Sequence, residues 1–165
     1  MSYHNKNTEK IANIFSKVLD AEIKAPQQVD LEKLRDYDLI GFGSGIYDGK
    51  LHNLILNLAD DLPSVSKKNV FIFSTCGIPA FAFNNRYTNS NHSIIRDKLQ
   101  SKGYKIIGEY SCVGHNTNSF LKYFGGINKG RPDGNDLEKA RKFALGIKEK
   151  YSHTNRKIPK NRPHK

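Results

Sequence analysis

Three short segments rich in Ser, Thr, Asn and Gly contain most of the residues that could bind a ligand. They are residues 2–8 (SYHNKNT), 43–50 (GSGIYDGK) and 74–77 (STCG). Proteins use hydroxyls, side-chain amides and free backbone N–H groups to hold phosphate groups and the polar edges of heterocycles. The three segments therefore predict a binding site for a small anionic or polar molecule.

The first segment runs directly into an apolar helical pattern. Backbone N–H groups at a helix start, helped by the helix dipole, can hold an anion such as phosphate. The alternative is simple capping of that helix by Asn7 or Thr8. The segment does not have the G-x-x-x-x-G-K-[ST] spacing of a P-loop, which argues against hydrolysis of nucleoside triphosphates.

The second segment contains a Gly-x-Gly run followed by a tyrosine. Glycines permit unusual backbone angles and close approach to a ligand, and Tyr47 could stack on a flat ring. The alternative is an ordinary surface turn with an amphipathic tyrosine. Residues 41–45 do not complete a G-x-G-x-x-G fingerprint, so they give little support to a nicotinamide site.

The third segment offers one candidate nucleophile, Cys76. The sequence fixes no base partner for it, and buried cysteines are usually inert, so we predict no catalytic residue. The other cysteine is Cys112, and two cysteines make neither a disulfide framework nor a four-ligand zinc site. We therefore expect no metal centre and a cytoplasmic location.

The spacing of apolar residues predicts the elements that position these segments. Helical spacing predicts helices over residues 11–19, 51–62, 94–103 and 137–147, and a helical turn at 31–34. Apolar runs predict strands at residues 38–43, 69–73 and 104–110, with a short outer strand at 20–25. Alternating strands and helices indicate a parallel sheet with both faces covered. Because ligands bind beyond the carboxyl ends of such strands, the three segments should share one edge.

In this order the segments resemble the flavodoxin-like family, in particular its small prokaryotic members. Residues 2–8 look like the family's phosphate loop, although the run is one residue longer than T/S-x-T-G-N-T and has Lys6 where Gly is usual. Residues 42–49 and 73–77 are similar to the loops at the flavin ring, and residues 125–132 also resemble a run in small members. The resemblance covers roughly residues 2–147. It implies a three-layer αβα sandwich with a parallel sheet in the order 2-1-3-4-5.

The resemblance also implies a cofactor, flavin mononucleotide (FMN), and a set of contact residues. Those at the phosphate would be Ser2, Asn5, Lys6, Asn7 and Thr8. Those at the isoalloxazine ring would be Ser44, Gly45, Ile46, Tyr47 and Gly49, and those at its pyrimidine edge Ser74, Thr75, Cys76 and Gly77. The cofactor would carry the chemistry and the protein would tune it.

Three functions agree with this interpretation. The first is electron transfer, and the second is an FMN-dependent oxidoreductase acting on a quinone, porphyrin or similar acceptor. The third is a binding module without flavin. Residues 78–92 and 111–132 could cover the flavin, dock a partner or form a substrate pocket, or they could simply be surface loops.

Charge divides the chain into a domain at residues 1–150 and a tail at 151–165. Of the net charge of +11, five positive charges lie in the tail, which leaves six on the domain. The tail is either simply solvated or an electrostatic binding segment for an acidic partner, anionic lipid or RNA. No motif supports nucleic-acid binding. Dedicated flavodoxins are usually acidic, so this basic chain should meet an acidic redox protein or a small organic acceptor. No apolar run reaches the roughly 18 residues of a membrane span.

The first strand of the implied order has no residues to form it. In the order 2-1-3-4-5 this strand lies inside the sheet, and its absence would leave backbone groups unpaired in the core. Our hypothesis is that the start of this sequence lies downstream of the true start. The rival hypothesis is a truncated relative that borrows a strand. Either way, we expect weak retention of FMN by the chain as written.

Overall fold

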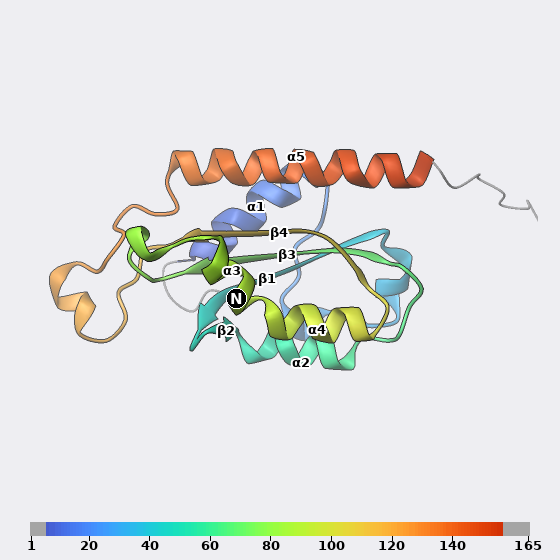
Figure 1. Ribbon diagram of the computed structural model, residues 1–165, viewed down its shortest axis with the longest axis horizontal. Coiled ribbons are helices and arrows are strands. Elements are labelled where there is room, and N and C mark those ends of the chain that lie inside the picture. Colours follow the sequence, from blue (N-terminus) through green and yellow to red (C-terminus); the bar gives the residue numbers. More distant parts are fainter. Residues whose placement is uncertain (1–5, 157–165) are drawn as a thin grey trace, which may run out of the picture.

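Parallel strands alternate with helices along the chain, and the strands form one sheet between two helical layers (Figure 1). This computed structural model describes residues 6–156. The sheet has the order β2-β1-β3-β4. Its strands are β1 (Leu39–Tyr47), β2 (Lys50–Leu51), β3 (Asn69–Cys76) and β4 (Lys105–Val113). β1, β3 and β4 are parallel, while β2 pairs antiparallel with the end of β1. The predicted α/β class is confirmed.

Two helices cover each face of the sheet. α1 (Asn7–Leu19) and α5 (Gly134–Arg156) lie side by side on one face, and α2 (Asn53–Asp61) and α4 (Ser93–Ser101) lie on the other (Figure 1). α3 (Asn85–Asn91) immediately precedes α4. α5 extends through the first residues of the predicted tail, and residues 157–165 lie outside the described part of the chain. None of the described helices is long and apolar enough to cross a membrane.

Each face of the sheet has its own apolar core. On the α1/α5 face an aromatic cluster forms around Phe15, whose ring centroid lies 5.5 Å from that of Phe71 and 4.9 Å from that of Phe73. On the α2/α4 face the core gathers around Phe42, Ile72 and Leu99. Every residue of β3 is buried, as a central strand covered on both faces requires.

The strands extend further toward their carboxyl ends than the apolar runs predict. Residues 44–47 and 74–76, predicted to follow their strands, belong instead to β1 and β3. Polar residues are tolerated inside these buried strands because neighbouring elements supply hydrogen-bond partners. For example, Ser74 stands opposite Ser111 of β4 and its hydroxyl donates to the Ser111 hydroxyl over 2.8 Å.

β1 and β2 form a tight antiparallel hairpin, which the apolar pattern of the sequence does not predict. Its two turn residues, Asp48 and Gly49, have φ angles of 49° and 76°. Positive φ at both central positions is the requirement of a type I′ turn, and Asp-Gly is a favoured pair for it. The turn therefore reverses the chain at the carboxyl edge of the sheet.

The outer strand predicted at residues 20–25 does not form within the described chain. α1 ends at Leu19, and Asp20 adopts a left-handed conformation with φ of 53°. Residues 21–25 have no regular secondary structure. Two short 3-10 helices follow, η1 (Pro26–Gln28) and η2 (Lys33–Asp36), and the second overlaps the predicted helical turn. The observed sheet thus contains the 3-4-5 part of the predicted order as β1, β3 and β4.

Candidate functional site at the carboxyl edge of the sheet

The start of α1 is fixed to the carboxyl ends of β3 and β4. The hydroxyl oxygens of Thr8 and Thr75 lie 2.8 Å apart, and Asn7 Nδ2 donates to the His115 carbonyl over 2.8 Å. The structure thus brings together the first and third segments singled out in the sequence. Ser2 and Asn5, predicted at the same place, lie outside the described residues.

The amino end of α1 offers donors to a ligand. The N-cap residue, Lys6, makes no side-chain capping bond, and the first backbone bond of the helix runs from Lys10 N to Lys6 O over 3.1 Å. The N–H groups before Lys10 therefore have no partner within the helix, and such groups bind anions. Lys6 also has a φ of 50°, a left-handed conformation that favours glycine.

Asn7 carries a buried acceptor without a donor. The residue is 8% exposed, and its Oδ1 atom has no hydrogen-bond partner among residues 6–156. An unpaired buried oxygen of this kind costs about 1–3 kcal/mol. A hydroxyl or N–H group from a bound molecule, placed beside the helix start, would remove that cost.

Four residues predicted to contact the flavin have buried side chains: Ser44, Ser74, Thr75 and Cys76. Ser44 donates to the Gly45 carbonyl over 2.7 Å and accepts from His52 N over 3.0 Å. Because these side chains are buried, a ligand at this edge of the sheet would contact the backbone and the residues that follow the strands.

Tyr47 lies at the end of β1 with its ring close to Gly45. A Cβ atom at Gly45 would come within 2.9 Å of the ring, and the ring meets that of His52 edge-on with centroids 5.4 Å apart. Tyr47 remains half-buried at the edge of the sheet, next to the Asp48–Gly49 turn. Its position is compatible with the predicted stacking role, which stays a prediction.

The two cysteine thiols are not activated as nucleophiles. Burial raises the pKa of Cys76 to about 11 and that of Cys112 to about 12. Both cysteines are free and buried, and they stay protonated near neutral pH. Within the described chain, no cluster of three or more His, Cys, Asp or Glu residues is arranged to hold a metal ion.

The long segment after β4 folds onto the loop after β3. Asn116 Nδ2 donates to Gly77 O over 2.9 Å, and Asn128 Nδ2 donates to Ile78 O over 2.7 Å. Three aromatic residues of these loops are largely exposed: Phe81 at 93%, Tyr123 at 77% and Phe124 at 83%. The loops therefore form a connected rim with exposed rings. The roles of Asn116 and Asn128 depend on contacts 39 and 50 residues away along the chain, which spacing does not reveal.

A buried polar network beneath the edge was also missed. His92 Nε2 lies 2.8 Å from Ser74 Oγ, and His92 Nδ1 lies 2.9 Å from Glu109 Oε2. Arg96 donates to both oxygens of Glu109, over 2.7 and 2.8 Å. Burial opposes ionisation of Glu109, but the hydrogen bonds and charges of His92 and Arg96 prevail and lower its pKa to about 2.

Comparison with known proteins identifies a sequence relative of this chain and solved structures with the same fold. No protein-family model matches the chain. Uncharacterized protein MJ0298 of Methanocaldococcus jannaschii is 44% identical over 146 residues, which cover 88% of this chain and 93% of that protein. A solved short-chain flavodoxin associated with a bacterial microcompartment superposes with a TM-score of 0.63 at 18% identity, covering 91% of this chain and 94% of the other. The chain belongs to the same family as MJ0298 of Methanocaldococcus jannaschii. Its fold is flavodoxin-like.

Other flavodoxin-like structures agree. A flavodoxin from the domain Archaea has a TM-score of 0.59 at 14% identity and covers 90% of this chain and 93% of its own. A WrbA-like flavodoxin from Agrobacterium tumefaciens has a TM-score of 0.59 at 16% identity, with coverages of 90% and 91%. At these identities the likeness establishes the fold. It confirms the resemblance drawn from the loop segments and their order.

Proposed function

We propose that this flavodoxin-like chain binds FMN at the carboxyl edge of its sheet and transfers electrons through it. The observation that carries the proposal is the pairing of the uncapped start of α1 with the buried, unpartnered Asn7 Oδ1. A phosphate needs the N–H donors, and a polyhydroxyl chain such as ribityl supplies the donor that Asn7 Oδ1 needs. The solved flavodoxins with this fold support the choice of a flavin.

Different parts of the described chain would contact different parts of the cofactor. Backbone N–H groups at Asn7 and Thr8 would meet the phosphate, with the Lys6 charge nearby, and Tyr47 would lie against the ring. The loop beginning at Gly77 would meet the pyrimidine edge. The bound cofactor would supply one- and two-electron chemistry, while the chain orients it and excludes water. Ser2 and Asn5 remain proposed phosphate contacts.

A second candidate is an FMN-dependent oxidoreductase of a quinone, porphyrin or similar acceptor. The exposed rings of Phe81 and Phe124 on the rim favour it, because flat apolar acceptors bind to aromatic surfaces. The electron carrier has a different supporting feature, the net charge of +11, which suits an acidic redox protein. Steady NAD(P)H-driven reduction of a quinone without an added reductase would favour the enzyme. We propose a cytoplasmic location, in keeping with two free thiols.

Flavin titration tests the proposal directly. We expect the fluorescence of FMN to be quenched on binding, and riboflavin, which lacks the phosphate, to bind at least about tenfold more weakly. Replacing Asn7 by Leu should weaken the binding of both flavins, because it removes the unpartnered oxygen. The matched control is Asn13→Leu, at an exposed position of the same helix. Equal affinity for FMN and riboflavin would contradict the phosphate site, and no binding of either would favour a flavin-free module.

A further inference from the structure

Two loop regions at the carboxyl edge of the sheet carry three large rings that the described chain leaves uncovered. They are residues 77–91 and 114–132, which together form the rim beside the candidate site. Phe81 belongs to the first region, and Tyr123 and Phe124 belong to the second. Figure 1 shows the second region, in orange, projecting beyond the sheet at the end where α5 begins. Exposed apolar side chains on neighbouring loops mark a binding surface.

Other aromatic residues of the rim pack within it. Phe83 and Tyr87 are partly buried, and their ring centroids lie 6.3 Å apart. Phe81 precedes this pair by two residues and remains almost wholly exposed. A ring that the loop needed for its own packing would be covered, so folding of the loop does not account for the exposure of Phe81.

The second region presents its rings from a closed base. Asn116 and Ile127 exchange two backbone hydrogen bonds of 3.0 and 2.9 Å, so residues 117–126 leave and return at the same point. Gly126 N also donates to Leu121 O over 2.8 Å. Compact loops with closed ends are frequently functional. Because these bonds hold the loop in place, binding through its rings needs little further ordering.

The rim contains no acidic residue. None of the 16 Asp and Glu residues of the chain lies in it, whereas four Lys and Arg residues do: Arg86, Lys122, Lys129 and Arg131. Arg131 is paired with Asp136. Arg86 and Lys129 are exposed and form no ion pair with another described residue. The rim therefore combines projecting rings with positive charge that the described chain does not neutralise.

This combination fits the surface of an anionic membrane. Aromatic rings are favoured at the boundary between lipid headgroups and acyl chains, and Lys and Arg are attracted to anionic lipids. A lipid surface needs no complementary pocket, so it suits rings that project from two separate loops. A small ligand requires a concave site, and a single-stranded nucleic acid requires a positively charged groove along its backbone.

We propose that the rim docks on an anionic membrane surface and inserts Phe81, Tyr123 and Phe124 between the headgroups and the acyl chains. Arg86 and Lys129 would meet the lipid phosphates. Docking would bring the carboxyl edge of the sheet to the lipid, in which an apolar acceptor such as a quinone dissolves. That last link rests on the proposed function, whereas the docking itself does not depend on flavin.

Vesicle sedimentation tests the docking without added flavin. The probe is vesicles of phosphatidylglycerol mixed with phosphatidylcholine, compared with vesicles of phosphatidylcholine alone. We expect the double variant Phe81→Ser, Phe124→Ser to bind the anionic vesicles at least about tenfold more weakly than the original chain. The matched control, Ile23→Ser with Ile94→Ser, changes exposed apolar positions outside the rim and should alter binding by less than about twofold.

A second pair of double variants tests the charges. Arg86→Gln with Lys129→Gln should weaken binding to the anionic vesicles at least about fivefold, because each cation near an anionic leaflet adds attraction. Lys17→Gln with Lys139→Gln removes the same charge from exposed positions of α1 and α5 and should alter binding by less than about twofold. Equal effects of the two pairs would show that net charge alone attracts the chain, and would overturn the proposal.

A fluorescent reporter shows whether the rim enters the lipid. The chain contains no tryptophan, so Phe124→Trp introduces a single one at the rim. We expect its emission to shift to shorter wavelength on anionic vesicles and to be quenched by lipids with brominated acyl chains. Ile23→Trp, outside the rim, should show neither change. An unshifted emission of Phe124→Trp on bound protein would overturn the proposal.

The remaining outcomes separate the possible partners of the rim. Equal vesicle binding by the original chain and by Phe81→Ser, Phe124→Ser would overturn the insertion of the rings. Binding of an acidic [2Fe–2S] ferredoxin that the ring variant loses, without binding to vesicles, would assign the rim to a protein and also overturn the proposal. Ring-dependent vesicle binding by a chain that does not bind FMN would support the docking and contradict the proposed function alone.

Discussion

The hydroxyl of Ser74 lies 2.8 Å from Nε2 of His92, and neither side chain is exposed to solvent. Together with Glu109 on the other ring nitrogen, the arrangement has the connectivity of a Ser-His-acid triad. A nucleophile must reach its substrate, and the Ser74 hydroxyl is enclosed within the sheet. The network therefore serves to hold β3, β4 and the start of α4 together.

Replacing His92 by Phe tests this structural role. The ring would be kept, but Ser74 and Glu109 would each lose a buried hydrogen-bond partner, so we expect a loss of about 2–3 kcal/mol in the free energy of unfolding. Urea denaturation followed by circular dichroism measures it. The neighbouring Ser93→Ala removes only a solvent-exposed hydrogen bond to the Ser90 carbonyl and should change the stability by less than about 1 kcal/mol. A similarly small loss for His92→Phe would contradict the role.

The lowered pKa of Glu109 predicts a dependence of stability on pH. Its folded pKa of about 2 lies below the ordinary 4.5, so the unfolded chain binds the proton more readily. The contribution is complete above about pH 4.5 and is lost as the pH falls toward 2, with a total of about 3 kcal/mol.

Urea denaturation between pH 2 and 7 checks this dependence. Glu109→Gln should be less stable at neutral pH and should show a flatter profile in the acid range. Glu138→Gln removes an exposed carboxylate of α5 and should keep the steep profile. An unchanged acid profile in Glu109→Gln would show that other groups cause the acid lability.

The bond between the Thr8 and Thr75 hydroxyls predicts a coupling between α1 and β3. Thr8→Val or Thr75→Val alone leaves one buried hydroxyl unpaired and should each cost about 1–2 kcal/mol. The double variant removes both hydroxyls and should cost about 1 kcal/mol less than the sum of the two. A double-mutant cycle of unfolding free energies measures this coupling, and strict additivity would show that the bond contributes nothing.

Two glycines should respond oppositely to replacement by alanine. Gly103 has a φ of 84°, and a Cβ atom there would collide with the Val65 carbonyl. We expect Gly103→Ala to destabilise the protein by about 2 kcal/mol. Gly146 lies inside α5 with open space beside it, so Gly146→Ala should stabilise by about 0.5–1 kcal/mol. Thermal unfolding of the two variants gives the comparison, and equal effects would contradict it.

The candidate site was only partly predictable. The sequence pointed to Asn7 and Thr8 because hydroxyl and amide residues preceded an apolar helical pattern. It could not show that Thr8 would meet Thr75, or that the Asn7 amide would bind the His115 carbonyl and leave its oxygen unpartnered. Those relationships join residues 67 and 108 positions apart, which local spacing cannot encode.

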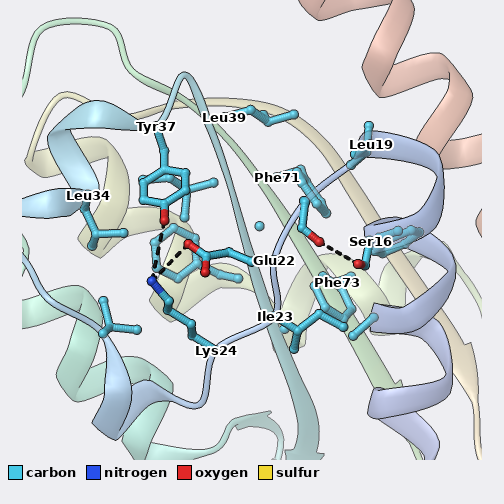
Figure 2. A pocket seen from close by; sticks show the side chains of 18 of the residues that line it. Ser16, Leu19, Glu22, Ile23, Lys24, Leu34, Tyr37, Leu39, Phe71 and Phe73 are labelled. Atoms are coloured by element: carbon cyan, nitrogen blue, oxygen red, sulfur yellow. Dashed lines mark hydrogen bonds and ion pairs between the residues drawn. The ribbon is translucent and has the colours of Figure 1, made fainter.

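Local patterns alone determined the class of this protein. Apolar runs such as residues 69–73 alternate with helical spacing, and a parallel sheet with both faces covered is the arrangement that buries both. The tertiary structure decided the strand ends, because Ser44 and Ser74 can lie inside a sheet only where other elements supply their partners. It also decided the groove lined by β1, α1, α2 and the segment after α1 (Figure 2), since an open sheet edge exists only once the neighbouring strands have been placed in space.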